Sequence, residues 1–442
     1  MNKISGIITN VCRLVLSVTL ILSGFVKAID PLGTQYKIQD YLSALSLPNL
    51  LPDWMTLGMS VGLSALEFCL GIFLLMAIHR RLTARATLVL MAVMTVISLW
   101  LWIANPVSDC GCFGDAIHLT NGQTLLKNVV LLAAAVVVSW RPLRMVRFIS
   151  KTNQGIVISY SILFIVAVST YCLYDLPLFD FRPYHTGADI RQGMEIPDSA
   201  EQPQFETTFI MEKDGVRKEF SLADYPDSTW TFVDSKTVMT REGYVPPIHD
   251  FSIERIDTGD DITEDVLNDT SYTFLLISPL LERASDSNFG NIEQIYEYSQ
   301  DHGYAFYCLT SSDEAGMERW RELTGAEYPF CRCDATTLKT IIRSNPGLLL
   351  LKGGKVIRKW SHNFLPDEEE LTVPLDQLPL GQLPKGTTLQ RITNILLYFV
   401  VPLLVLTIAD RLWAWTRWLK RKKKKKTDKA PEATTDKASE TI

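Results

Sequence analysis

Two cysteines separated by a single residue, Cys110 and Cys112, lie in the stretch Asp-Cys-Gly-Cys-Phe-Gly-Asp at 109–115. Thiols exchange disulfides and bind soft metals. A bridge between such close cysteines closes a small, strained ring, and strained disulfides are the readily exchanged ones. Gly111 and Gly114 permit the tight backbone that this ring needs. Three interpretations follow: a candidate catalytic redox pair, a compact turn with two thiols, or a metal site.

The metal interpretation has the weakest support, because the six histidines are scattered along the chain and none accompanies the pair. We therefore expect no metal. The flanking Asp109 and Asp115 disfavour a thiolate and should raise the pKa values of both thiols. If Cys110 and Cys112 are redox-active, we expect a slow exchanger that needs a docked partner. The compact turn stays open as the alternative.

Other cysteines are secondary candidates. Cys172 lies near the end of an apolar segment, where it either approaches the pair or fills space in a helix. Cys331 and Cys333 repeat the one-residue spacing. One interpretation is a second redox pair. The other is a structural role, either as one buried and one exposed thiol or as a small stable bridge. Cys308 is expected in a protein core.

An acidic residue, Glu67, lies within an apolar segment. Ionisable groups in membrane spans are functional candidates by default. The alternative is a protonated or hydrogen-bonded glutamate that fixes helix packing. A transporter is a third possible function of the protein, and it would rest on Glu67 alone. Lys27 is a countercharge in sequence, but Glu67 is about 12 residues, roughly 18 Å, into its span. We therefore expect no direct pair.

Around these residues, six apolar segments are each long enough to cross a bilayer. They are Ile7–Ile29, Met55–Ile78, Leu82–Ile103, Thr124–Trp140, Gly155–Tyr174 and Ile392–Ala409. A cleaved signal peptide is an alternative for the first, although no clear cleavage site follows it. Residues 176–390 have the composition of a soluble protein. The basic block Lys420–Lys426 follows the last span, which indicates an anchor at an anionic membrane surface rather than nucleic-acid binding.

Lysine and arginine mark cytoplasmic loops. They cluster at 79–85, at 141–151 and in the C-terminal tail, whereas the loop at 104–123 has none. This distribution predicts that both termini are cytoplasmic. The cysteine loop and residues 176–390 then lie on the outer side, which for a bacterial inner membrane is the oxidising periplasm.

Three stretches resemble one family of membrane proteins. Residues 23–33 look like the first helix and exit turn of DoxX-type proteins, and Leu66–Gly71 resembles their acidic second helix. The Cys-Gly-Cys-Phe-Gly run at 110–114 resembles the MauE branch, the methylamine-utilisation proteins. The MauE proteins are associated with disulfide formation in a periplasmic dehydrogenase. The resemblance covers about residues 5–145 and implies a redox-associated membrane role rather than a particular reaction.

The outer region first shows β-type alternation and then an α/β order. Expected strands are Phe205–Glu212, Arg217–Phe220, Thr229–Val233, Tyr272–Ser278, Tyr304–Leu309, Gly347–Leu351 and Val356–Trp360, and expected helices are Phe289–Asp301, Asp313–Thr324 and Thr336–Ile342. The α/β part resembles the thioredoxin-like TlpA-type proteins, which implies a cis bond at Pro346. The Cys-x-x-Cys of that fold is missing, because Ser278-Pro279-Leu280-Leu281 stands at its place. Thioredoxin-type exchange at that place is therefore excluded.

We thus predict a membrane all-α helical bundle, with four DoxX-like spans and two flanking spans, joined to an α/β thioredoxin-like soluble domain. The predicted parts are the bundle (1–150), the fifth span (151–176), a β-rich segment (177–245), the thioredoxin-like domain (246–390), the sixth span (391–413) and the tail (414–442). Two functions compete: a thiol–disulfide component that uses Cys110 and Cys112, and a non-catalytic interaction protein. The first would exchange with a periplasmic protein thiol and pass electrons to a membrane quinone.

Overall fold

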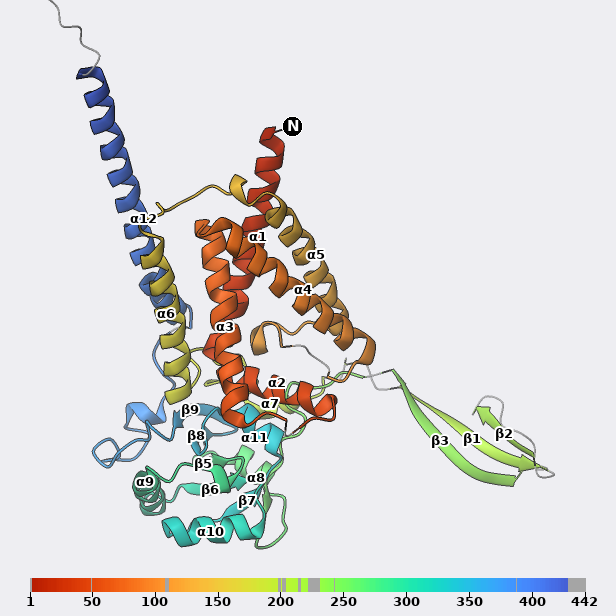
Figure 1. Ribbon diagram of the computed structural model, residues 1–442. Coiled ribbons are helices and arrows are strands. Elements are labelled where there is room, and N and C mark those ends of the chain that lie inside the picture. Colours follow the sequence, from red (N-terminus) through yellow and green to blue (C-terminus); the bar gives the residue numbers. More distant parts are fainter. Residues whose placement is uncertain are drawn as a thin grey trace, which may run out of the picture. The chain divides into compact units, whose positions relative to one another are not determined.

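The computed structural model describes residues 2–48, 50–107, 111–197, 200, 204–213, 216–221, 231–241, 243–386 and 388–427. The chain divides into two compact units. The first comprises Met1–Phe181 and Lys385–Ile442 and is helical, and the second comprises Arg182–Pro384 and contains the β-strands (Figure 1). Cys110 lies outside the described residues, as do the first two positions of the strand expected at Thr229–Val233.

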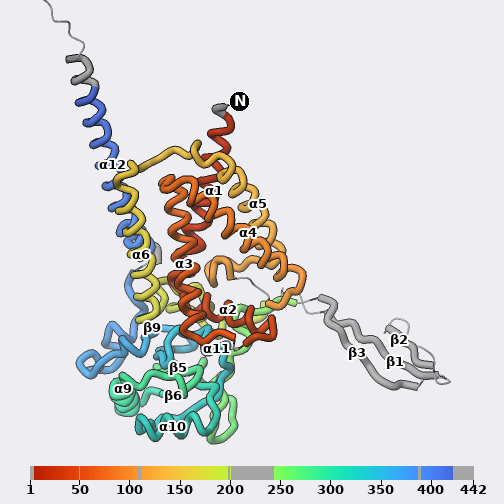
Figure 2. The backbone as a smooth tube through the Cα atoms, viewed as in Figure 1, coloured from red at the N-terminus to blue at the C-terminus, as the bar shows by residue number. Residues whose placement is uncertain are grey.

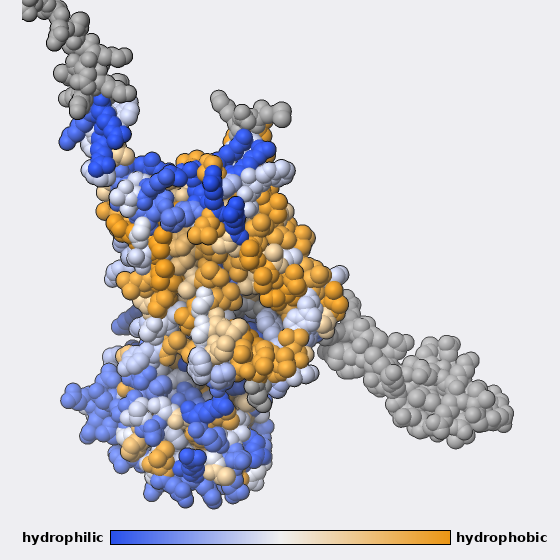
Figure 3. Space-filling model, viewed as in Figure 1, coloured by the Kyte–Doolittle hydropathy of each residue, from blue (hydrophilic) through white to orange (hydrophobic). Residues whose placement is uncertain are grey.

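Within the described residues, six helices of the first unit are long and apolar enough to cross a membrane, as the sequence predicts. These six helices are α1 (Asn2–Ile29), α3 (Asp53–Met76), α4 (Arg80–Ala104), α5 (Asn121–Trp140), α6 (Gln154–Tyr174) and α12 (Thr388–Thr427). A shorter helix, α2 (Pro31–Ala44), lies between α1 and α3 in the chain. Apolar side chains cover the flanks of these helices, and hydrophilic ones gather at the end that carries the N-terminus (Figure 3). This banding is what a bilayer requires of a bundle that spans it.

Helix α2 occupies a stretch in which the sequence suggested only a loop. Asp30 caps the start of this helix with a carboxylate that accepts a hydrogen bond from the backbone N–H of Gly33, and Pro31 suits the first helical position. The helix packs on the start of α3. Ser60 Oγ donates to the carbonyl of Pro31 at 2.7 Å, and Nε2 of Gln35 donates to the Thr56 hydroxyl at 3.1 Å. The first turns of α3 are therefore covered by α2.

Helices α1 and α3 cross at very short range. A Cβ atom on Gly24 would stand 2.4 Å from the backbone nitrogen of Phe68, and one on Gly71 would stand 2.8 Å from that of Ile21. Only glycine permits such an approach, which is the small-residue packing common between membrane helices. The two contacts fix the antiparallel register of α1 against α3, with Gly24 level with Phe68.

Helix α12 continues to Thr427, well past the end of the apolar segment at Ala409. Asp410 is buried and joins it to the segment before α6: its oxygens accept from the Ser150 backbone N–H at 2.7 Å, the Ser150 hydroxyl at 2.6 Å and the Asn153 amide at 2.7 Å. Earlier in α12, Phe399 packs on Phe164 of α6, with the two ring centroids 4.5 Å apart. The last span is thus part of the helical unit.

The second unit is built on a six-stranded sheet with the order β4-β7-β6-β5-β8-β9. Strands β5 and β6 are parallel, and β8 and β9 form an antiparallel hairpin on the other side of β5. The bounds are β4 (Glu254–Arg255), β5 (Tyr272–Ser278), β6 (Ala305–Thr310), β7 (Phe330–Arg332), β8 (Gly347–Lys352) and β9 (Lys355–Ser361). The Asn345–Pro346 bond before β8 is cis. This is the thioredoxin-like arrangement expected from the sequence.

Helices α7 (Ile190–Met194), α8 (Thr263–Asn268), α9 (Phe289–Asp301), α10 (Glu314–Thr324) and α11 (Ala335–Ile341) accompany the sheet, and Figure 2 traces their backbone. Every residue of β5 is buried, because the strand lies inside the sheet with both faces covered. The core includes Phe274, Phe306, Cys308 and Trp320, so Cys308 is in the core as expected. The short elements α7, α8, β4 and β7 were not predicted, because so few residues leave no periodic pattern.

A separate antiparallel sheet has the order β2-β1-β3. Its strands are β1 (Gln204–Lys213), β2 (Val216–Ser221) and β3 (Thr231–Arg241). The β-type alternation of this region therefore predicted the right kind of structure, although β3 is longer than the expected Thr229–Val233. It extends because Arg241 at its far end pairs with Gln204 at the start of β1.

Candidate functional site

Of the Cys-Gly-Cys-Phe-Gly run at 110–114, the structure describes Gly111 and the residues that follow it, Cys112 first. Gly111 and Gly114 both adopt left-handed backbone angles, with φ of +62° and +52°. The backbone N–H of Gly114 donates to the carbonyl of Gly111 at 3.0 Å, which closes a tight turn. A short 3-10 helix, η1 (Gly114–Ala116), follows. The two glycines therefore have the role in a tight backbone that the sequence suggested.

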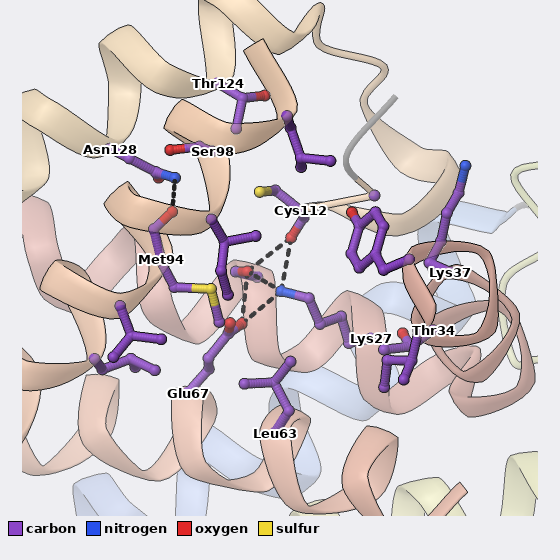
Figure 4. A pocket seen from close by; sticks show the side chains of 18 of the residues that line it. Lys27, Thr34, Lys37, Leu63, Glu67, Met94, Ser98, Cys112, Thr124 and Asn128 are labelled. Carbon is purple, nitrogen blue, oxygen red and sulfur yellow. Dashed lines mark hydrogen bonds and ion pairs between the residues drawn. The ribbon is translucent and has the colours of Figure 1, made fainter. Parts of the chain in front are cut away.

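The carbonyl oxygen of Cys112 is held by two side chains of α1 (Figure 4). Nζ of Lys27 donates to it at 2.9 Å, and Oγ of Ser23 lies 2.8 Å from it. The same ammonium donates to the Ser23 hydroxyl at 2.8 Å and to Oε2 of Glu67 at 2.7 Å. An ammonium has three protons, so these three acceptors satisfy Lys27 completely.

Lys27 and Glu67 form a salt bridge, so the expectation that they do not pair is wrong. The expectation counted the depth of Glu67 from the start of its own span. The close contact of Gly24 with Phe68 shows that about ten residues at the start of α3, ~15 Å, lie beyond the end of α1. The Lys27 side chain also leans toward the helix N-terminus, as side chains on α-helices do, and so reaches the level of Ser23.

This pair is buried, with side-chain exposures of 7 % for Lys27 and 5 % for Glu67. Two charges removed from water are tolerated only where geometry and further hydrogen bonds are good. Ser23 supplies such a bond, because its hydroxyl lies 2.7 Å from Oε2 of Glu67. The cluster of Ser23, Lys27 and Glu67 thus ties two helices to the cysteine loop.

Beside the cluster lies a cavity of about 600 Å³ within the helical unit. That volume suits a small molecule. The walls are mainly apolar and come from α1 to α5 and the cysteine loop; among them are Leu20, Tyr41, Met59, Gly62, Leu63, Met94, Ile97 and Leu131. The polar lining residues include Lys27, Glu67, Ser98, Cys112, Thr124 and Asn128, labelled in Figure 4. No sequence pattern indicated this cavity, because its lining residues are scattered over five helices.

Cys172 packs elsewhere in the helical unit. It is buried with Cys69, Phe68 and Phe179 in a cluster formed by α1, α3, α6 and α12. Cys172 is not among the residues that line the cavity, whereas Cys112 is. Cys172 thus packs in the core of the helical unit, which is one of the two alternatives that the sequence offered, and Cys69 packs in the same cluster.

The second unit has its thioredoxin-type position filled by a hydrogen-bonded network. Oγ of Ser278 donates to the side-chain oxygen of Asn345 at 2.7 Å, and the Asn345 amide donates to the carbonyl of Leu280 at 2.8 Å. The Asn345 carbonyl accepts from the backbone N–H of Ser285 at 3.0 Å. Pro346 follows directly. The residue before the cis-proline is thus fully engaged by its own chain at this point.

Cys331 and Cys333 are both buried and unbridged, so neither is the exposed thiol considered from the sequence. Burial raises the pKa of Cys331 to about 12 and that of Cys333 to about 11. A thiol must ionise to act as a nucleophile. At neutral pH both groups therefore remain protonated. Among the described residues, no group of three His, Cys, Asp or Glu side chains is placed to hold a metal ion.

Taken together, fold and site define a polytopic membrane bundle joined to a thioredoxin-like domain that lacks the active cysteines. Residues 5–141 match the family described as methylamine utilisation protein MauE, which confirms the resemblance seen in the sequence. The matched part contains helices α1 to α5 and the cysteine loop. Residues 205–242 match a domain of unknown function, DUF8463. No curated protein matches the chain.

Two solved structures are similar to part of the chain. One is the solution structure of a candidate protein disulfide isomerase from Bacteroides thetaiotaomicron, with 18 % identity, coverage of 27 % of this chain and 78 % of that one, and a TM-score of 0.21. The other is an uncharacterized conserved protein from Geobacillus kaustophilus, with 15 % identity, coverage of 31 % and 83 %, and a TM-score of 0.24. The fold of the second unit is defined by its own strand order.

Proposed function

We propose that this protein is a thiol–disulfide component of a bacterial inner membrane, with Cys110 and Cys112 as the exchanging pair on the periplasmic side. The observation that carries the proposal is the attachment of Cys112. Its carbonyl accepts from Lys27 and lies within hydrogen-bond distance of Ser23, and both side chains are buried. A buried charged network of this kind holds a loop backbone in one position, which an exchanging cysteine requires.

In the proposed reaction, the disulfide between Cys110 and Cys112 is attacked by a thiolate of an exported client protein. One sulfur of the pair leaves as a thiolate, and a mixed disulfide forms. The second client thiolate then attacks the mixed disulfide. The client gains a disulfide, and the pair becomes two thiols that hold the two electrons of the client.

Trapping tests this proposal directly. A Cys112→Ser variant should leave Cys110 to hold the client as a mixed disulfide, visible on a non-reducing gel of alkylated membranes. Cys69→Ser, which changes a buried packing cysteine, is the matched control and should trap nothing. If neither Cys110→Ser nor Cys112→Ser traps a partner, and the double variant supports growth like the wild type, the pair is structural.

A second function is supported by the closed network of the thioredoxin-like domain. Ser278, Asn345 and Leu280 satisfy one another where the active cysteines of this fold stand. The domain would then bind client polypeptides by shape, and the helical unit would anchor it. In that case the double cysteine variant stays functional, while deletion of residues 246–384 abolishes function.

A further inference from the structure

We infer that the end of the helical unit that carries the N-terminus binds the phosphate of an anionic phospholipid through Arg13, Arg80 and Arg147. The inference goes beyond the proposed function, because it concerns other side chains than those at the cysteine loop. Three features of the described residues carry it: guanidinium groups with donors left over, a shortage of carboxylates around them, and exposed apolar side chains beside them.

The three arginines converge on one loop, the connection between α5 and α6. Nη1 of Arg13, from α1, donates to the carbonyl of Val146 at 2.7 Å. Nη1 of Arg80, the first residue of α4, donates to the neighbouring carbonyl of Met145 at 3.1 Å. Arg147 belongs to the loop itself, and its positive charge is close enough to repel that of Arg80. Three guanidinium groups are therefore gathered at one place.

Each of these guanidinium groups keeps donors that the chain does not use. An arginine side chain carries five N–H donors and no acceptor. The Nε atoms of all three arginines are buried and have no hydrogen-bond partner among the described residues. Arg13 as a whole is only 5 % exposed. The Phe148 ring, with its centroid 5.3 Å from Cζ of Arg13, attracts this cation but carries no charge. A buried cation of this kind is costly without an anion.

Carboxylates that could neutralise these charges are scarce at this end of the bundle. The helices and loops that meet there contain one acidic residue, Asp410, in the segments 2–29, 77–104, 121–174 and 388–427. Both oxygens of Asp410 are already engaged by Ser150 and Asn153. Within the described chain, none of the three arginines forms an ion pair. An anion from outside the chain would supply the missing countercharge.

A phosphate group has the chemistry that this arrangement requires. Its oxygens accept hydrogen bonds, and planar guanidinium groups bind them with paired N–H donors. The start of α4 adds to the attraction. His79 provides no side-chain cap there, and the helix dipole is positive at that end. Arg80 therefore stands where backbone N–H groups also favour an anion.

Exposed apolar side chains beside the arginines favour a phospholipid over a soluble phosphate. Leu143, Val146 and Phe148 of the same loop are 56 %, 55 % and 39 % exposed. Hydrophilic and apolar side chains border each other at this end of the bundle (Figure 3). A headgroup phosphate with acyl chains beside it matches both kinds of surface, as basic clusters at membrane surfaces do when they bind anionic lipids. A soluble phosphate would match only the arginines.

Two arginines provide a matched pair of variants. The Arg147 side chain makes no hydrogen bond or ion pair with another described residue, so Arg147→Gln removes a guanidinium of the site without breaking a bond of the chain. Arg85 of α4 is exposed and lies outside the site. Arg85→Gln makes the same change of charge near the same end of the bundle. The pair separates a built site from the general attraction of basic residues to anionic lipid.

Full-length protein is purified in mild detergent and titrated with phosphatidylglycerol or phosphatidylcholine, and native mass spectrometry measures the bound lipid. Wild type and Arg85→Gln should bind one phosphatidylglycerol about tenfold more tightly than phosphatidylcholine. Arg147→Gln should bind phosphatidylglycerol about tenfold more weakly than wild type, because one charge-assisted contact to the phosphate is lost.

Inorganic phosphate, added at the same concentration as the lipid, distinguishes the two sources of phosphate. It should leave phosphatidylglycerol bound to the wild type. Displacement of the lipid by inorganic phosphate would assign the site to a soluble anion and overturn the inference. Equal phosphatidylglycerol affinities of Arg147→Gln and Arg85→Gln would overturn it as well, because the binding would then be general surface attraction.

Discussion

Nζ of Lys27 lies 2.7 Å from Oε2 of Glu67, although the two residues are 40 positions apart in the chain. The same ammonium also holds the carbonyl of Cys112. One buried ion pair therefore connects α1, α3 and the cysteine loop. The position of the candidate redox loop depends on a charge pair that the protein must keep complete, since an unpaired buried charge is strongly destabilising.

Removal of one partner of the Lys27–Glu67 pair should destabilise the protein more than removal of both. We expect Lys27→Met to lower the free energy of unfolding by about 3–5 kcal/mol, because Glu67 is left as an unpaired buried carboxylate. The double variant Lys27→Met with Glu67→Leu should recover most of that loss. Thermal unfolding of the wild type, the single variants Lys27→Met and Glu67→Leu and the double variant, all in one detergent, measures the coupling energy between the two residues. Additive effects of the two substitutions would mean that the pair contributes nothing to stability.

The sequence contained a signal for this pair that depth counting missed. Gly24 and Gly71 lie in antiparallel neighbouring helices, and each allows a backbone contact too close for any side chain. Aligning the helices on these glycines brings Glu67 level with the last turns of α1. The span lengths alone placed the two charges far apart, because α2 was unrecognised and α3 starts well beyond the end of α1.

Membrane orientation is a prediction that follows from the basic residues of the loops. We expect a protease added to spheroplasts to digest residues within 176–390 and to leave the tail after Lys420 intact, because lysine and arginine favour the cytoplasmic side. Antibodies against a tag in each region report the two outcomes on one gel. Protease added to lysed cells should remove both tags. Loss of the tail tag from intact spheroplasts would reverse the topology.

The rate at which Cys333 is alkylated should report its burial. Because the pKa of Cys333 is raised to about 11, its thiolate fraction at pH 8 should be roughly 100-fold below that of an ordinary cysteine. The labelling rate should then rise about tenfold with each pH unit and level off only near pH 11. Peptide mass spectrometry after iodoacetamide treatment measures this rate. Cys333 in urea is the control, and rapid labelling of the folded protein at pH 8 would contradict the burial.

The thioredoxin-like domain should not reduce disulfides. Residues 182–384, a compact unit with its own core, are expected to give no acceleration of insulin turbidity over that produced by dithiothreitol alone. The reason is that Ser278 stands where a nucleophilic cysteine is needed and is bonded to Asn345. A Cys331→Ser and Cys333→Ser variant serves as control. Reductase activity in that variant would refute the assignment of an inactive site.

The strand order of this domain was predictable, but its closed site was not. Strand β5 is an apolar run and α9 has a clear helical period, so both were found at their observed bounds. The network of Ser278, Asn345 and Leu280 joins residues about 65 positions apart. Such a contact leaves no local pattern, and only the missing cysteines pointed to a changed site. The burial of Cys333 likewise depends on packing between distant segments.

Gly111 offers the sharpest test of whether loop geometry controls exchange. Its φ of +62° costs a residue with a side chain about 1–2 kcal/mol. A Cβ atom there would also stand 3.1 Å from Cγ of Lys37. Gly111→Ala should therefore displace the neighbouring carbonyl of Cys112 from Lys27.

We expect client trapping by Cys112→Ser to fall about tenfold when Gly111→Ala is added, because a strain of 1–2 kcal/mol corresponds to roughly a tenfold change in the population of the held loop. Gly6→Ala is the matched control, since its Cβ meets no atom within 4 Å and its backbone is helical. Thermal unfolding of both variants should stay close to that of the parent. Trapping at the parental rate in Gly111→Ala would mean that exchange does not need the loop position held by Ser23 and Lys27.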